Sequence, residues 1–201
     1  DVVVDDIAFD SEEKGPSPIA YWKFDEGQGT TAEDSTSNNI EATLGASTAA
    51  PAWQKEELCI SGRCLLFDGS NDYVDTAAAS PLDISSSAHI SMSVWVKFSS
   101  KSVTGGSYWT PMILTETGQG DSTYDKGIRI DTSGRANFYV YDGATKYATG
   151  TTDLSDNNWH QITGTFDGSD IRVYVDGKLQ GTTAASGSYN FTSPQVVFSF
   201  H

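Results

Sequence analysis

Positive charge is scarce in this sequence. Its 201 residues contain 12 Lys and Arg against 27 Asp and Glu, which gives a formal net charge of −15 at pH 7. A surface of this charge repels phosphate backbones and anionic lipids, so neither nucleic acid nor a membrane surface is an expected partner. The charge suits high salt or divalent cations, or it simply keeps an exported protein soluble.

Long apolar runs are missing as well. No stretch approaches the roughly 18 residues that a membrane helix needs, so we expect no membrane insertion. Aromatic residues, in contrast, are abundant: five Trp, nine Tyr and nine Phe are too many for a disordered chain and predict a packed core. The length favours one domain, or one domain and a small addition.

Only two cysteines are present, Cys59 and Cys64. A structural zinc site needs four ligands, and the sequence offers no second pair. A local disulfide or two buried thiols remain, and Ser61-Gly62 supplies a reversal that favours the disulfide. A bridge this short contributes about 2 kcal/mol by the chain-entropy model. It implies an oxidising compartment, and hence an extracellular or cell-surface location.

No window shows a helical stripe, and apolar and polar residues alternate with a period of two instead. This alternation predicts strands with one face in the core, over residues 90–98, 136–141, 161–166 and 171–176. Asp167-Gly168 and Asp176-Gly177 supply the positive-φ positions of tight hairpins. The sequence therefore predicts an all-β fold, a two-sheet antiparallel sandwich or jelly roll.

Five motifs, in order, resemble those of laminin-G-like modules. They lie within residues 19–31, 64–74, 89–98, 158–168 and 173–177, and include Ile19-Ala20-Tyr21-Trp22-Lys23-Phe24-Asp25-Glu26-Gly27 and Val173-Tyr174-Val175-Asp176-Gly177. The resemblance implies a two-sheet antiparallel jelly-roll sandwich of the concanavalin-A-like/laminin-G-like type over residues 19–201.

One departure from the family concerns its closing strand, of the type Gly-x-Ile-Asp-Asp-Val-x-Ile-Tyr. The chain stops after Gln195-Val196-Val197-Phe198-Ser199-Phe200-His201, so we expect residues 19–201 to lack their own last strand. Residues 1–9 resemble that closing strand instead, and residues 10–18 are predicted to be a linker. We expect this donor strand to act through Val2, Val3, Val4, Ile7 and Phe9. Three arrangements of residues 1–9 are compatible with the sequence. The segment folds back onto its own domain, it belongs to a preceding repeat, or it inserts into a neighbouring copy.

The best metal candidates are Asp25, Glu26 and Asp34, in and beside a Gly-rich loop. Calcium prefers several oxygen ligands of this kind. The resemblance implies a structural calcium ion here, with Asp6 of the closing strand nearby. The alternative is a solvated acidic turn.

Catalytic motifs are absent. Glycanases that share this sandwich carry a Glu-x-Asp-x-x-Glu strand, which this sequence lacks, and no other hydrolase or phosphate-loop motif occurs. We expect no enzymatic activity. Trp95, Tyr139, Tyr141 and Tyr174 fall on the outward phases of their strands and are candidates for a glycan platform, unless that face packs against another layer.

The sequence leads to two hypotheses about function. The first is a non-catalytic extracellular module, a structural or adhesive building block of a surface or filamentous assembly, whose neighbouring copies are joined head-to-tail by the N-terminal strand. The second is a carbohydrate-binding module of a larger exported protein, with a polysaccharide as partner. Asn190 begins an N-glycosylation sequon, which would be modified only if the source organism carries out N-glycosylation.

Overall fold

The computed structural model describes residues 17–83, 89–99, 109–116, 124–141, 144–185 and 195–199; for 109–116 and 124–125 it describes the backbone alone. Strands dominate, which confirms the all-β prediction. The strands are β1 (Thr31–Ala32), β2 (Ala42–Leu44), β3 (Ala52–Gln54), β4 (Cys64–Leu66), β5 (Tyr73–Thr76), β6 (Ile90–Val96), β7 (Trp109–Glu116), β8 (Tyr124–Asp131), β9 (Ala136–Tyr141), β10 (Thr145–Thr149), β11 (His160–Phe166), β12 (Asp170–Val175), β13 (Lys178–Ala184) and β14 (Gln195–Ser199). Three single-turn 3₁₀ helices accompany them: η1 (Ser47–Ala49), η2 (Glu56–Leu58) and η3 (Ser80–Leu82).

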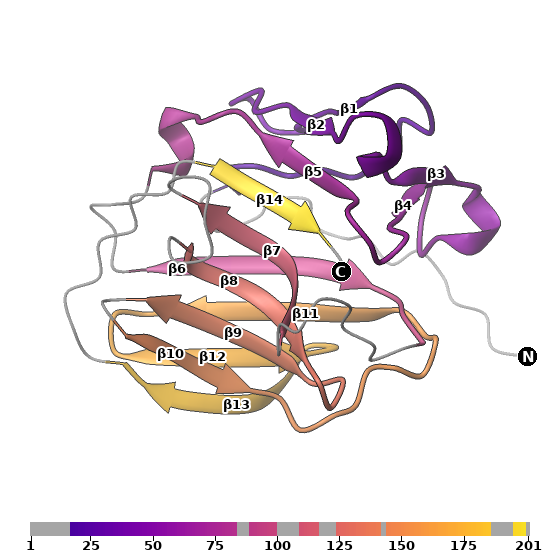
Figure 1. Ribbon diagram of the computed structural model, residues 1–201. Helices are drawn as coiled ribbons and strands as arrows, with labels where there is room; N and C mark the ends of the chain where they lie inside the picture. Colours follow the sequence, from indigo (N-terminus) through magenta and orange to yellow (C-terminus); the bar gives the residue numbers. More distant parts are fainter. Residues whose placement is uncertain are drawn as a thin grey trace, which may run out of the picture.

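The strands form two main layers of unequal size. The larger sheet has the order β1-β2-β5-β14-β7-β8-β9-β10, and the smaller has the order β13-β12-β11-β6. Figure 1 shows β8, β9 and β10 in front of the smaller sheet, and contacts of β9 and β10 with β12 and β13 join the two layers. A separate hairpin pairs β3 with β4. This two-sheet antiparallel sandwich confirms the predicted fold class.

Period-two alternation explains how the layers hold together. Along β12, Ile171, Val173 and Val175 are buried while the residues between them are partly exposed. The β12–β13 turn uses Asp176 and Gly177 at φ values of 50° and 73°, as the Asp-Gly pair predicts. The inward side chains of both sheets make one continuous core: Ala32, Ala42, Leu44, Val74, Phe98, Ile128, Ile130, Ala136, Phe138, Val140, Ala148, Leu154, Ile162, Phe166, Ile171, Val173, Val175, Ala185, Val196 and Phe198.

The last described strand occupies an interior place in the larger sheet. β14 pairs with β5 on one side and with β7 on the other, and Figure 1 shows it, in yellow, between them. The inward ring of Phe198 lies nearly perpendicular to the rings of Trp22 and Phe24, each with its centroid 5.4 Å away. The segment after Gln195 thus joins the N-terminal and central strands of the larger sheet. The predicted donor strand, residues 1–9, and most of the linker lie outside the described residues.

The two layers come close together at Gly164 of β11, which lies against Phe138 of β9. A Cβ at Gly164 would come within 2.2 Å of the Phe138 ring. Neither backbone can move aside easily, because each strand pairs with a neighbour on both sides. Glycine at this position sets how near the sheets can come.

Replacing Gly164 therefore tests the layer contact. We expect Gly164→Ala to lower the free energy of unfolding by about 1–3 kcal/mol, the usual cost of overpacking a core. Urea denaturation measures this change. Thr165→Ala, on the outer face of the same strand, is the control and has a smaller effect. Equal stability of the Gly164→Ala variant and the parent would contradict the packing described here.

Candidate functional site

Asp34 lies at the centre of a hydrogen-bond network in the first loop. Its Oδ1 accepts the N–H groups of Tyr21 and Thr36, both at 2.9 Å, and its Oδ2 accepts the N–H of Ile40 at 2.9 Å. The Thr36 hydroxyl donates to the same Oδ2 at 2.7 Å. The side chain is only 7% exposed. Asp34 therefore fixes the backbone of the opening segment, which in turn positions Trp22 on the core.

The same contacts set the charge state of Asp34. Burial by itself raises the pKa of this carboxyl, but the hydrogen bonds from Ile40, Tyr21 and Thr36 outweigh burial and bring its pKa below the usual 3.8. The folded state thus favours the ionised carboxylate. Its stabilising contribution is complete above pH 3.8 and is lost as the pH falls through the lower folded value.

Substitution of Asp34 should be costly at neutral pH. We expect Asp34→Asn to lower the free energy of unfolding by about 1–3 kcal/mol, because an amide cannot accept all four hydrogen bonds. The difference from the parent should narrow as the pH falls below 3.8, where the parent carboxyl becomes protonated. Urea denaturation across this pH range measures both effects, with Glu33→Gln as an exposed control. A difference that stays constant with pH would contradict this role.

The other two predicted calcium ligands have separate partners. Asp25 Oδ1 accepts the N–H of Arg63 at 3.0 Å, and Glu26 Oε1 accepts the N–H of Glu33 at 2.9 Å. Glu26 Oε2 is buried without a hydrogen-bond partner, as expected of an oxygen that a cation could satisfy. Yet within the described part of the chain no three His, Cys, Asp or Glu side chains group closely enough to hold a metal ion. Asp6 lies outside that part, and the calcium site stays a prediction.

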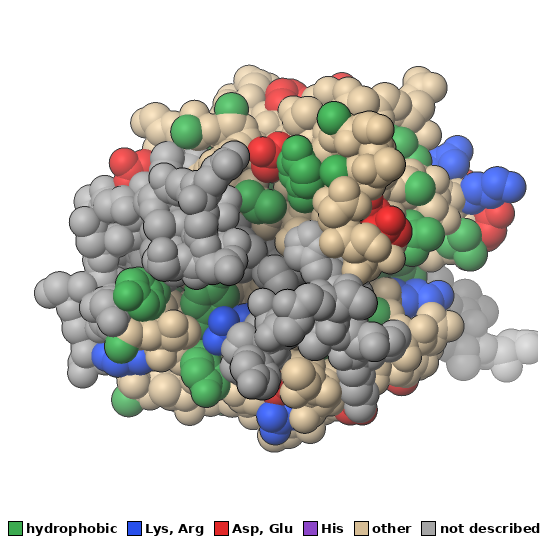
Figure 2. Space-filling model, viewed as in Figure 1, with side chains coloured by type: hydrophobic (Ala, Val, Ile, Leu, Met, Phe, Trp, Pro, Cys, Tyr) green, Lys and Arg blue, Asp and Glu red, His purple; other side chains and the backbone are tan. Residues whose placement is uncertain are grey.

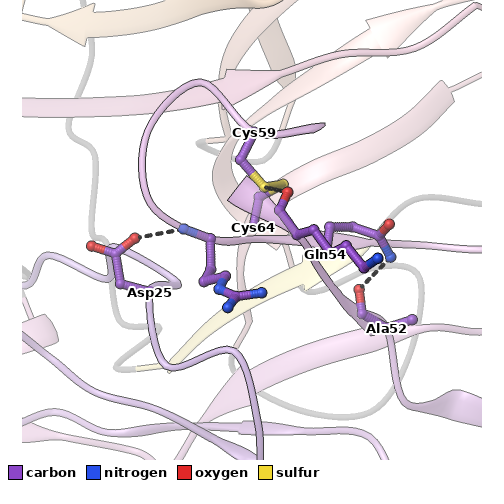
Figure 3. Close-up of a disulfide and its surroundings, with 7 residues drawn as sticks. Asp25, Ala52, Gln54, Cys59 and Cys64 are labelled. Carbon is purple, nitrogen blue, oxygen red and sulfur yellow. Dashed lines mark hydrogen bonds between the residues drawn. A yellow bond between two sulfur atoms is a disulfide. The ribbon is translucent and has the colours of Figure 1, made fainter. Parts of the chain in front are cut away.

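Cys59 and Cys64 form the predicted disulfide. Their Cα atoms are 5.6 Å apart, and the bridge closes the loop that leads into β4. Figure 3 shows Asp25 reaching this loop through its bond to the Arg63 backbone. The bridge and this hydrogen bond together tie the first loop to the β3–β4 hairpin.

The four predicted glycan-binding aromatics do not form one platform. Trp95 of β6 and Tyr174 of β12 lie on the outer face of the smaller sheet, because Val94 and Val173 beside them point into the core. Tyr139 and Tyr141 lie on the outer face of the larger sheet, on the opposite side of the sandwich from Phe138. The structure therefore divides the set into two pairs on opposite faces.

The pair on the larger sheet belongs to a cluster that we call the tyrosine–arginine face, made of Arg129, Tyr139, Tyr141 and Tyr147. The register places Tyr147 beside Tyr139, and the guanidinium of Arg129 lies 4.5 Å from the Tyr139 ring centroid and 5.7 Å from that of Tyr147. Tyr139 is 3% exposed, whereas Tyr141 and Tyr147 are 39% and 41% exposed. Tyr139 is thus a buried support for Arg129, and the two outer rings are accessible.

Burial affects the guanidinium at the centre of this face. It lowers the pKa of Arg129 below the usual 12.5, while the neighbouring Tyr139 and Tyr147 act in the opposite direction. Arginine stays charged in proteins. The face therefore holds a partly desolvated cation against two aromatic rings, an arrangement that strengthens the cation–π contact.

The candidates predicted from the sequence include neither Arg129 nor Tyr147. A signal was present: Arg129 alternates with the apolar Ile128 and Ile130, which places it on the outward phase of its strand. A single sequence does not show that β8 pairs with β9 and β9 with β10, nor in which register. That pairing brings the arginine and the tyrosines together.

His160 lies between two carboxylates at the start of β11. Its Nδ1 is 2.9 Å from Asp176 Oδ2, and its Nε2 is 3.1 Å from Asp156 Oδ1. Burial by itself lowers the pKa of His160, but the two carboxylates raise it above the usual 6.5 overall. The ring thus connects the loop before β11 to the β12–β13 turn.

A family model matches about two thirds of the chain. The model describes the laminin-G-like group of the concanavalin A-like lectin/glucanases superfamily, and it matches residues 68–198. The chain belongs to this superfamily. A search of curated proteins finds no match. No helix of this superfamily member, in the segments that the structure covers, is long and apolar enough to cross a membrane.

Solved structures share the fold at low sequence identity. A mutant of HCR/D has a TM-score of 0.62 and 17% identity, covering 87% of this chain and 42% of its own. The binding domain of botulinum neurotoxin DC in complex with SialylT has a TM-score of 0.56 and 13% identity, covering 88% and 44%. Domain 4 of AbnA, an extracellular arabinanase from Geobacillus stearothermophilus, in complex with arabinotriose, has a TM-score of 0.54 and 14% identity, covering 84% and 79%. This chain thus spans less than half the length of the first two of these solved chains.

Proposed function

We propose that this domain is a non-catalytic carbohydrate-binding module that holds its glycan on the tyrosine–arginine face. The observation that carries the proposal is the position of Tyr141 and Tyr147, two exposed rings on adjacent strands, with the Arg129 guanidinium 5.7 Å from the Tyr147 ring centroid. Figure 2 shows hydrophobic and basic side chains together in the lower left of the view, over the region of β9 and β10.

The chemistry of this face suits a sugar. Aromatic ring faces pack against the C–H groups of a pyranose or furanose, and tyrosine hydroxyls add hydrogen bonds at the ring edge. A guanidinium offers several fixed N–H donors to sugar hydroxyl or carboxylate oxygens. An apolar surface rimmed by such polar groups is typical of a binding site.

The related structures support the same conclusion. Two of the proteins that share this fold are described in complex with SialylT and with arabinotriose, and one of these is a domain of an extracellular enzyme. The Cys59–Cys64 disulfide favours an extracellular or cell-surface location for this chain too. The missing Glu-x-Asp-x-x-Glu strand favours binding without hydrolysis.

Substitution of the exposed rings tests the proposal. We expect the domain to be retained on at least one polysaccharide in an affinity pull-down, arabinan among those tried, and Tyr141→Ala or Tyr147→Ala to weaken retention at least tenfold. Each ring removed costs a stacking contact worth about 0.5–1.5 kcal/mol beyond its buried area. Trp95→Ala, a matched change on the opposite face, should leave retention unchanged. No retention on any polymer, or equal loss in all three variants, would contradict the proposal.

A second candidate function is that of a building block, in which residues 1–9 of one copy join it to the next. The observation that favours it is that β6 is an edge of the smaller sheet, with no second neighbour among the strands that the structure describes. Joining through an added strand would suit an extracellular surface or filament, since it requires no further domain.

Removal of the leader tests this second function. We expect the full chain to form dimers and longer species as its concentration rises, and a chain without residues 1–14 to stay monomeric. Light scattering after size exclusion measures the mass of both. A full chain that is monomeric at every concentration, and no more stable than the truncated one, would contradict the building-block function.

A further inference from the structure

Strand β6 forms one edge of the smaller sheet. All seven of its residues, from Ile90 to Val96, pair with β11, from Phe166 to His160. On its other side no strand of the described segments pairs with it. Its N–H and C=O groups on that side form a row that another strand could bond.

The core is also incomplete beneath this edge. The inward side chains of the interior strands β11 and β12 are closed off from solvent, and Ile162, Ile171 and Val173 are fully buried. In β6 the inward residues are only partly buried, although they point into the same core: Ile90, Met92, Val94 and Val96. The apolar layer therefore continues to the edge of the sheet, and no strand among the described residues covers it there.

The composition of β6 does not protect the edge. Natural sheets shield exposed edges with lysine, proline, a bulge or a very short strand. Residues 90–96 contain no charged residue and no proline, and their pairing with β11 runs without a register shift. A seven-residue edge of this kind has the features of a surface that is covered in the functional state.

We propose that the free edge of β6 is the acceptor site for residues 2–9 of a second copy of this chain, which add as one more strand of the smaller sheet. Those residues include three valines and one isoleucine, and alternate positions place Val3, Ile7 and Phe9 on one face, which also carries Asp5. Directed inward, Val3, Ile7 and Phe9 cover the partly buried residues of β6. Main-chain hydrogen bonds supply the affinity, and the apolar face supplies the register.

The linker is long enough for the donor to be a second copy. The described part of the chain begins just before Ile19, whose carbonyl accepts a hydrogen bond from Asn38 Nδ2 at 2.7 Å and so anchors the end of the linker. Residues 10–18 can span about 30 Å when extended, enough to reach a neighbouring molecule. A donor at one end and an acceptor edge on β6 make a head-to-tail contact, which produces open chains unless its rotation closes a ring. The inference rests on the second proposed function and names its acceptor.

Cysteine cross-linking tests the acceptor directly. Ile7→Cys is made in one full-length chain, and Met92→Cys or Val94→Cys is made in another. The two are mixed and mildly oxidised, and a non-reducing gel measures the product. We expect a disulfide-linked heterodimer with both acceptor variants. Ser93→Cys, whose side chain points to the outer face of β6, is the matched control and should cross-link at least tenfold less.

Each other outcome overturns the inference in a distinguishable way. If only a single chain carrying both Ile7→Cys and Met92→Cys cross-links, and within itself, the leader completes its own sheet. If light scattering finds oligomers but no β6 variant cross-links in the mixture, the building-block function stands and β6 is not its acceptor. If the chain is monomeric and nothing cross-links, both proposals fail. Near-ultraviolet circular dichroism confirms that each variant is folded.

Discussion

The packing of β9 against β11 is the contact on which the rest of the structure depends. Gly164 lets the ring of Phe138 lie directly on the opposite sheet, and this fixes which side of β9 faces the core. Once Phe138 points inward, strand geometry puts Tyr139 and Tyr141 outward. The register then places Tyr147 opposite Tyr139, and Arg129, opposite Asn137, extends its guanidinium over the Tyr139 ring. The tyrosine–arginine face is thus a consequence of the core, formed on its reverse side.

The sequence predicts the sandwich well because a period of two is a local signal. The alternation in β12 and the Asp176-Gly177 turn report directly on burial and backbone conformation. The candidate sites are harder to predict. The alternation tells whether a side chain points away from the core, but not to which of the two sheets its strand belongs. Trp95 and Tyr141 share an outward phase and lie on opposite faces for this reason. Tyr139 also shares it and is nevertheless buried, since its neighbours Arg129 and Tyr147 lie against its ring.

Asp34 illustrates a second limit of sequence reasoning. A carboxylate in a Gly-rich loop fits calcium chemistry and backbone capping equally well at the level of residue types. Four hydrogen-bond donors converge on Asp34, a feature that depends on how residues 21, 36 and 40 fold around it. Each of these contacts favours the ionised group, as a metal ion would. The lowered pKa of Asp34 is therefore explained by the protein's own backbone.

The two proposed functions use different ends of the molecule. The tyrosine–arginine face lies on β8, β9 and β10, and β9 and β10 pack over β12 and β13. In the smaller sheet, β13 and β6 are the two opposite edges. A strand added to β6 thus leaves the tyrosine–arginine face open, and each added copy presents another such face. Linked copies would bind a polymeric glycan at several points, so that weak individual contacts combine into strong retention through effective concentration.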